Sequence, residues 1–173
     1  KKIILYIAAS LDQRIAEPNG SLDWLIKFSN SNKTDSSCND LLASVNTILI
    51  GGSAYRELLN MNIIWPYQKQ IIYAILAMIE AKKPRFITDN TIEAISSLRN
   101  EPRKDILLVG GGRLISMLLA ADMIEEMQIE YMTIILGEGI PLFPVQSKES
   151  KWKLTNYNSY NSGVLKVIYI LNN

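Results

Sequence analysis

Short apolar runs alternate along the chain with segments whose apolar residues recur at helical spacing. Buried strands are predicted over residues 2–9, 47–50, 70–77, 84–88 and 105–109. Helices are predicted over residues 35–45, 53–60, 90–100 and 113–121. This alternation predicts an α/β architecture around a largely buried sheet.

The pattern changes after the last of these helices. Residues 125–136 predict one long strand, and strands over 151–160 and 164–171 are separated by the turn residues Asn161-Ser162-Gly163. We therefore expect an antiparallel carboxyl-terminal part that follows a parallel start. No repeat or linker divides the sequence, so a single domain is expected over residues 1–173.

The composition narrows the chemistry that the chain can perform. Its 48% hydrophobic and 20% charged residues exclude a disordered chain. The net charge is +1 without a basic stripe, so no nucleic-acid partner is expected. The absence of histidine, with Cys38 as the single cysteine, excludes serine–histidine and cysteine–histidine sites, zinc fingers and intramolecular disulfides. Catalysis must therefore use carboxylates, hydroxyls, amines, backbone groups or a cofactor.

The apolar run at residues 3–9 is too short to cross a bilayer. Asp12 and Arg14 follow it without a signal-type cleavage site. We interpret the run as a buried first strand, and expect a cytoplasmic protein without a membrane partner.

Two glycine-rich junctions join predicted strands to helices. Residues 106–113, ILLVGGGR, pass from an apolar strand through three glycines into a helix, and Gly51-Gly52-Ser53 repeats this arrangement. Glycines let the backbone approach a phosphate, and a helix start offers unpaired N–H groups. The pair of junctions suits the pyrophosphate of a dinucleotide, although the spacing matches neither standard phosphate-binding motif. The alternative is two tight turns without a ligand.

Asp35 is the first candidate carboxylate. It lies three and seven residues before Cys38 and Leu42, which places it on the apolar face of its predicted helix. A carboxylate on an apolar face needs a partner, and a bound substrate is one candidate. The alternative is an N-cap of the helix.

Glu130 and Trp24 are the other candidates for the substrate end. In the strand predicted over 125–136, Glu130 shares a face with Gln128 and Met132, and it lines a cavity if both faces of the sheet are covered. Residues 10–24 contain a turn cluster and predict a loop that leaves the first strand. Trp24, at its end, either closes over a ligand or anchors the loop to the core.

Several stretches together resemble the dihydrofolate reductase-like family. They are similar, more closely, to the branch formed by the carboxyl-terminal reductase domain of bacterial riboflavin biosynthesis and its stand-alone relatives. The stretches are LYIAA (5–9), SLDQRIA (10–16), GSLDWL (20–25), TILIGGSAY (47–55), LLVGGGRLI (107–115) and LGEGIPLFP (136–144). The resemblance implies a three-layer α/β fold with a mostly parallel eight-stranded sheet and an antiparallel carboxyl-terminal hairpin.

The resemblance also implies a reductase site in the cleft at the strand ends. Ala8 and Ala9 would lie near the nicotinamide and the substrate, Arg14, Ile15 and Ala16 would flank the nicotinamide, and Val109 would border the substrate ring. The pyrophosphate would bind at Gly111, Gly112, Arg113 and Leu114, across from Gly51, Gly52 and Ser53, and Gly110–Gly111 would be a cis peptide.

This chain departs from the family pattern at two phosphate-binding positions. Residues 51–55 read Gly-Gly-Ser-Ala-Tyr where relatives read Gly-Arg-Lys-Thr-Tyr, so an arginine and a threonine are replaced. Leu76-Ala77 stands where relatives carry a Ser-Arg or Thr-Arg pair near the adenosine 2′-phosphate. These changes predict weak discrimination between NADPH and NADH.

From these residues and this resemblance we expect an NAD(P)H-dependent reductase that acts on a small molecule. NADPH is the expected cofactor, with NADH as the alternative. The acceptor would be a C=N or C=O group of a pterin-like or ribosylaminopyrimidine-type substrate, and the protein would be a homodimer. A non-catalytic nucleotide-binding relative that has lost its phosphate ligands is the alternative, and an interaction protein without a ligand is the third hypothesis.

Overall fold

The computed structural model describes residues 1–31, 37–61, 67, 70–75, 85–144 and 148–172. The strands within these ranges are β1 (Ile3–Ala9), β2 (Arg14–Ala16), β3 (Val45–Gly51), β4 (Ile71–Ile75), β5 (Arg85–Ile87), β6 (Asp105–Leu108), β7 (Glu126–Tyr131), β8 (Ile140–Pro141), β9 (Trp152–Ser159) and β10 (Leu165–Leu171). The helices are α1 (Asp23–Ser31), α2 (Ser37–Ser44), α3 (Gly52–Asn60), α4 (Thr91–Asn100) and α5 (Gly112–Ala120). No described helix has the length and apolar character needed to span a membrane.

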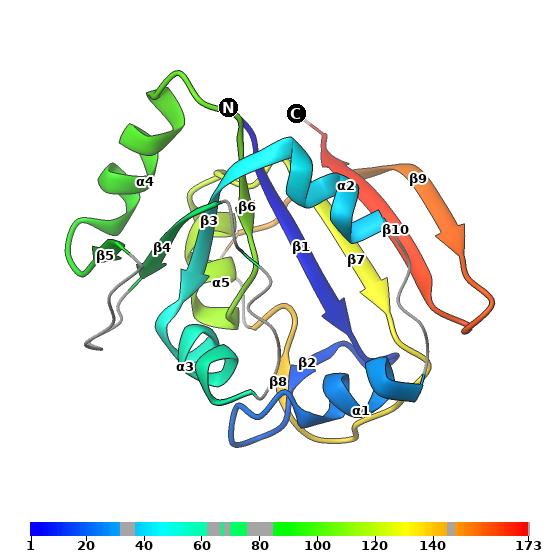
Figure 1. Ribbon diagram of the computed structural model, residues 1–173. Helices are drawn as coiled ribbons and strands as arrows, with labels where there is room; N and C mark the ends of the chain where they lie inside the picture. The colour runs from blue at the N-terminus through cyan, green and yellow to red at the C-terminus, as the bar shows by residue number, and fades with distance from the viewer. Residues whose placement is uncertain (32–36, 62–66, 68–69, 76–84, 145–147, 173) are drawn as a thin grey trace.

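Eight strands form one sheet in the order β5-β4-β3-β6-β1-β7-β10-β9 (Figure 1). The first six of these run parallel to one another, whereas β10 is antiparallel to both β7 and β9. The expected parallel start and antiparallel carboxyl-terminal hairpin are therefore confirmed. The short strands β2 and β8 pair separately.

Helices cover both faces of the sheet, and the alternation of side chains along β1 explains the two cores. Ile3 and Leu5 point to one face, where they pack in a cluster with residues of α4 and α5. Ile4 points to the other face, where Leu41 of α2 and Tyr55 of α3 cover it. In Figure 1, α2 and α3 lie in front of the sheet and α5 lies behind it.

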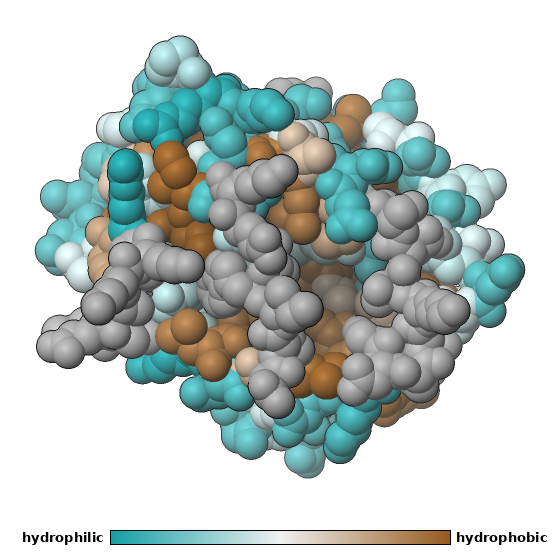
Figure 2. All heavy atoms as spheres, viewed as in Figure 1, coloured by the Kyte–Doolittle hydropathy of each residue, from teal (hydrophilic) through white to brown (hydrophobic). Residues whose placement is uncertain are grey.

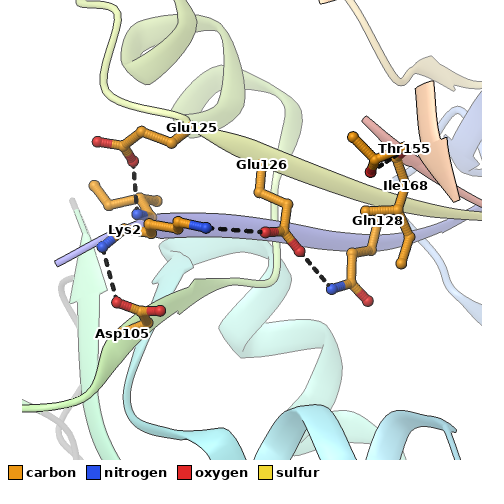
Figure 3. Close-up of polar contacts among 8 residues, drawn as sticks. Lys2, Asp105, Glu125, Glu126, Gln128, Thr155 and Ile168 are labelled. Carbon is orange, nitrogen blue, oxygen red and sulfur yellow. Dashed lines mark hydrogen bonds and ion pairs between the residues drawn. The ribbon is translucent and has the colours of Figure 1, made fainter. Parts of the chain in front are cut away.

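Polar contacts fix the amino-terminal end of β1 between its neighbours (Figure 3). The Lys2 backbone N–H donates to the Asp105 carboxylate at 2.9 Å, and the Ile3 N–H donates to the Glu125 carboxylate at 2.7 Å. The Lys2 ammonium lies 3.7 Å from a carboxylate oxygen of Glu126. These contacts hold the central strands in register at one edge and leave the opposite edge for a ligand.

Two predicted segments were wrong in extent. Residues 10–24, predicted as a loop, contain β2 and the start of α1. The strand predicted over 125–136 ends at Tyr131. Farther along, the backbone N–H groups of Leu136 and Gly137 donate to the Asp12 side chain rather than to a neighbouring strand.

Candidate functional site

A cleft of about 1450 Å³ opens at the carboxyl ends of the parallel strands. This edge of an open α/β sheet is where ligands usually bind. Sites for one small molecule typically measure about 300–1000 Å³, so the volume suits two ligands side by side. Figure 2 views the α2 and α3 side of the molecule, where apolar side chains gather in the middle of the face and hydrophilic ones around the rim.

The two glycine-rich junctions lie against each other in this cleft. The Gly51 N–H, at the end of β3, donates to the Gly110 carbonyl after β6 at 2.6 Å. A Cβ on Gly51 would lie 2.9 Å from the Gly111 nitrogen, so only glycine permits this approach. Gly110 has a φ of +115°, and the Gly110–Gly111 bond is cis, as the resemblance implies.

The starts of α3 and α5 therefore face the same space. Their N-cap residues, Gly51 and Gly111, provide no side-chain cap, so the first N–H groups of both helices remain for a ligand. Arg56 on α3 and Arg113 on α5 are exposed and line the cleft. Two helix starts with a cation on each are suited to bind a polyanion.

The structure brings most of the predicted cofactor and substrate residues to the cleft. Those that line it are Ala8, Ile15, Gly51, Gly52, Ser53, Val109, Gly110, Gly111, Gly112, Arg113 and Leu114. Ala9 is fully buried in the core on the other face of β1, and its carbonyl accepts from the Met132 N–H. The Arg14 guanidinium donates to the Gly139 carbonyl at 3.3 Å. Neither Ala9 nor Arg14 is among the lining residues.

The side chain of Trp24 is not placed as a lid. It is 3% exposed and packs against Met132 and Val164, which line the cleft, whereas Trp24 itself is not a lining residue. This position fits the second interpretation, in which it anchors the loop to the core. Asp35 and Leu76-Ala77 lie outside the described residues.

Glu130 lines the cleft at the end away from the helix starts, as the phase of its strand predicts. Tyr6, on the adjacent strand β1, hydrogen bonds to both Glu130 and the Cys38 thiol of α2. The Tyr6 hydroxyl is the donor in both contacts: it donates to the Glu130 carboxylate, and to the Cys38 sulfur when the thiol ionises. Lys166 of β10 lies directly opposite Glu130, with its ammonium 5.4 Å from the Tyr6 ring centre.

Burial dominates the titration of this group. It raises the pKa of the Tyr6 hydroxyl, and the neighbouring Glu130 charge raises it further. Burial also raises the pKa of the Cys38 thiol, while the Tyr6 hydrogen bond and the Lys166 charge act in the opposite direction. Both groups are therefore protonated at neutral pH.

Sequence reasoning missed the role of Tyr6 and Lys166. Alternation along β1 places Tyr6 on the same face as Ala8, and this pattern could have predicted that Tyr6 lines the site. The pairing of Lys166 with Glu130, 36 residues apart in sequence, depends on the register of the β7–β10 pair. Periodicity within one strand does not specify that register.

Asp12 joins the two loops that border the cleft. Its carboxylate accepts from the Ser10 hydroxyl at 2.6 Å and from the N–H groups of Leu136 at 3.1 Å and Gly137 at 2.8 Å. These donors, the Ser10 hydroxyl above all, lower the pKa of Asp12 to about 2. The contact fixes the segment that leads to Ile15, which lines the cleft.

Comparison with known proteins gives consistent results. Residues 79–166 match the RibD C-terminal domain family. The chain is 30% identical over 167 residues to the uncharacterized protein YwjB of Bacillus subtilis (strain 168), with 95% of each chain covered. It is similar to the crystal structure titled "Putative riboflavin biosynthesis protein" from Shewanella sp. PV-4, with a TM-score of 0.88, 25% identity and full coverage of both chains. Dihydrofolate reductase from Enterococcus faecalis, complexed with NADP(H), shares the fold at a TM-score of 0.67 and 13% identity, over 99% of this chain and 97% of that one.

Proposed function

The chain belongs to the RibD C-terminal domain family, and on that premise we propose that it is an NAD(P)H-dependent reductase. It transfers a hydride to a C=N or C=O group of a pterin-like or ribosylaminopyrimidine-type substrate. The observation that carries this proposal is the contact between Gly51 and Gly110, which places two uncapped helix starts together in one cleft.

The cofactor phosphates bind at these helix starts. The N–H groups of Gly52 and Ser53 on α3, and of Gly112, Arg113 and Leu114 on α5, are the donors. The cationic side chains of Arg56 and Arg113 add charge at the same end. A bound nicotinamide supplies the hydride, and the protein supplies the binding and orientation.

The middle of the cleft holds the reacting rings. Ala8, Ile15 and Val109 line it with small or apolar side chains that exclude water. Apolar walls of this kind favour a flat ring, and holding two rings in contact replaces much of the entropy cost of a bimolecular reaction. A carboxylate then orients the substrate: Glu130 lines the described cleft, and Asp35 is the alternative candidate.

Equilibrium binding of NADPH and NADH tests the proposal. Titration of the purified chain, followed by fluorescence of the reduced nicotinamide, is expected to give saturable binding that inorganic pyrophosphate competes for. Oxidation of the bound cofactor on addition of pteridines or ribosylaminopyrimidines would then identify the acceptor. No measurable affinity for either cofactor would favour the non-catalytic alternative, in which the replaced residues at 51–55 have abolished phosphate binding.

A further inference from the structure

Three polar residues lie on one face of β7, and two of them are partnered within the protein. Gln128 is 8% exposed and donates to the Glu126 carboxylate at 2.8 Å, while Glu126 also lies 3.7 Å from the Lys2 ammonium (Figure 3). Glu130, two residues farther along the same face, instead lines the cleft. The three residues therefore differ in role although they share a strand and a face.

The neighbours of Glu130 hold its side chain in the cleft. The Tyr6 hydroxyl donates to its carboxylate from β1, and Lys166 provides a positive charge from the opposite position on β10. Lys166 is 7% exposed and is not a lining residue, so its positive charge lies beside Glu130 within the protein and does not face the cleft. A ligand in the cleft thus meets the carboxylate rather than the ammonium.

The charges on the cleft wall are separated along its length. Among the lining residues that the structure describes, the cations are Arg56 and Arg113 at the helix starts, and the anion is Glu130. The lining also includes the apolar residues Leu25, Phe28, Leu42, Met132 and Val164, together with uncharged polar ones such as Asn39, Tyr160, Asn161 and Ser162. A phosphate beside Glu130 would meet a carboxylate, since the cations among the described lining residues lie at the helix starts, and this repulsion disfavours a bound anion.

Building on the proposed reductase function, we propose that Glu130 determines the substrate class. Its carboxylate accepts adjacent N–H donors of an unphosphorylated planar nitrogen heterocycle, and Tyr6 and Lys166 are the positioning residues. Paired N–H groups match the two oxygens of a carboxylate and form charge-assisted hydrogen bonds with it. Apolar lining residues such as Leu42 and Met132 are available to cover the faces of the ring. Recognition of an unphosphorylated ring favours a pterin-like substrate over a ribosylaminopyrimidine-type one.

The single cysteine makes the site observable without turnover. Cys38 lines the cleft and contacts Tyr6, so a ligand bound at Glu130 covers its thiol. We expect 2,4-diaminopyrimidine to slow alkylation of Cys38 by iodoacetamide, and calorimetry to give its Kd independently. In Glu130→Gln that Kd is expected to rise roughly 10- to 100-fold, because one charge-assisted pair is lost. Rates with the probe are divided by rates without it, so that a change in intrinsic thiol reactivity cancels.

Two variants separate recognition from general damage to the sheet. Glu126→Gln removes a carboxylate from the same strand and face, and is expected to leave the Kd of the probe unchanged. Tyr6→Phe keeps the ring but releases Glu130, and a smaller rise in Kd is expected. Its specific readout is the pH profile of Cys38 alkylation, which the groups facing this thiol determine: Tyr6, Glu130, Lys166 and Tyr67. Loss of the Tyr6 hydrogen bond should move that profile to higher pH.

The outcomes distinguish this inference from the proposed function. Equal protection by uridine 5′-monophosphate and by 2,4-diaminopyrimidine would overturn it, as would an unchanged Kd in Glu130→Gln or no protection in the natural chain. NADPH affinity is measured in the same samples. If 2,4-diaminopyrimidine protects Cys38 but NADPH does not bind, the proposed reductase function is refuted and the recognition site at Glu130 is supported. If NADPH binds but 2,4-diaminopyrimidine does not protect Cys38, the recognition site is refuted and the reductase function is supported.

Discussion

Replacing Gly111 by alanine tests where the cofactor phosphates bind. Gly111 is the N-cap of α5, with φ −86° and ψ −171°, a conformation that alanine adopts readily. A Cβ there would have one neighbour within 4 Å, the Cβ of Ala54 at 4.0 Å, at the start of α3. The added methyl group would thus occupy the space between the two helix starts without displacing other protein atoms.

Gly111→Ala is expected to raise the stability of the fold slightly and to lower the affinity for NADPH. Glycine-to-alanine changes at compatible positions stabilise a fold by about 0.4–1 kcal/mol. Charge-assisted hydrogen bonds contribute about 1.5–3 kcal/mol each, so losing one between a phosphate and the helix start raises the Kd for NADPH roughly 10- to 150-fold. A variant that is as stable as the natural chain but binds NADPH weakly is the specific expectation.

Gly112→Ala is the matched control. It is the next residue of the same helix start, but its Cβ would point away, lying 3.4 Å from both Ile140 Cγ2 and Pro144 Cγ. Thermal unfolding and NADPH titration of both variants complete the test. An unchanged Kd in a folded Gly111→Ala variant, or an equal loss of affinity in Gly112→Ala, would refute the assignment of the phosphates to this junction.

Three further predictions concern cofactor selectivity and two titrating groups. The Kd values for NADPH and NADH should differ less than about tenfold; a strong preference for NADPH that disappears in Arg56→Met would instead identify Arg56 as the 2′-phosphate ligand. Without ligand, the alkylation profile of Cys38 should move to lower pH in Glu130→Gln, because a negative charge that raises the thiol pKa is removed. Asp12 has a folded pKa of about 2, below its unfolded value of about 3.9, so its stabilisation is complete above the unfolded value and is lost as pH falls toward 2. The difference in Tm between the natural chain and Asp12→Asn, followed from pH 6 to 2, should shrink; a constant difference would contradict this cause.

The sequence predicts the elements of the sheet that have a strong local pattern. The fully apolar run of β6 and the three glycines after it identify a buried strand that turns sharply into a helix. The phase of Glu130 on β7 likewise follows from alternation alone, because Met127 and Ile129 occupy the core on the other face. Such features depend on residues close in sequence, where periodicity is informative.

The pattern of residues along the chain does not predict which distant segments pair. The strand β2 has three residues and exists because Arg14 and Ala16 pair with Ile140 and Pro141, more than 120 residues away. Its own pattern is too short to distinguish it from a loop. The contact of Asp12 with the segment after β7 also depends on residues distant in sequence, since its donors Leu136 and Gly137 lie more than 120 residues away.

In the proposed reductase, the separation of charge along the cleft would determine the orientation of both ligands. An anionic cofactor is attracted to the end with Arg56 and Arg113 and is repelled from Glu130, so its uncharged nicotinamide is directed toward the apolar middle. A heterocycle held by Glu130 through its N–H groups directs its opposite edge toward that same region. In the proposed reductase the two reacting rings would then meet beside Ala8 and Val109, which line the cleft from β1 and from just after the neighbouring strand β6. Reversal of the charge at residue 130, by Glu130→Lys, should therefore draw phosphates to the wrong end and inhibit hydride transfer even when NADPH affinity is retained.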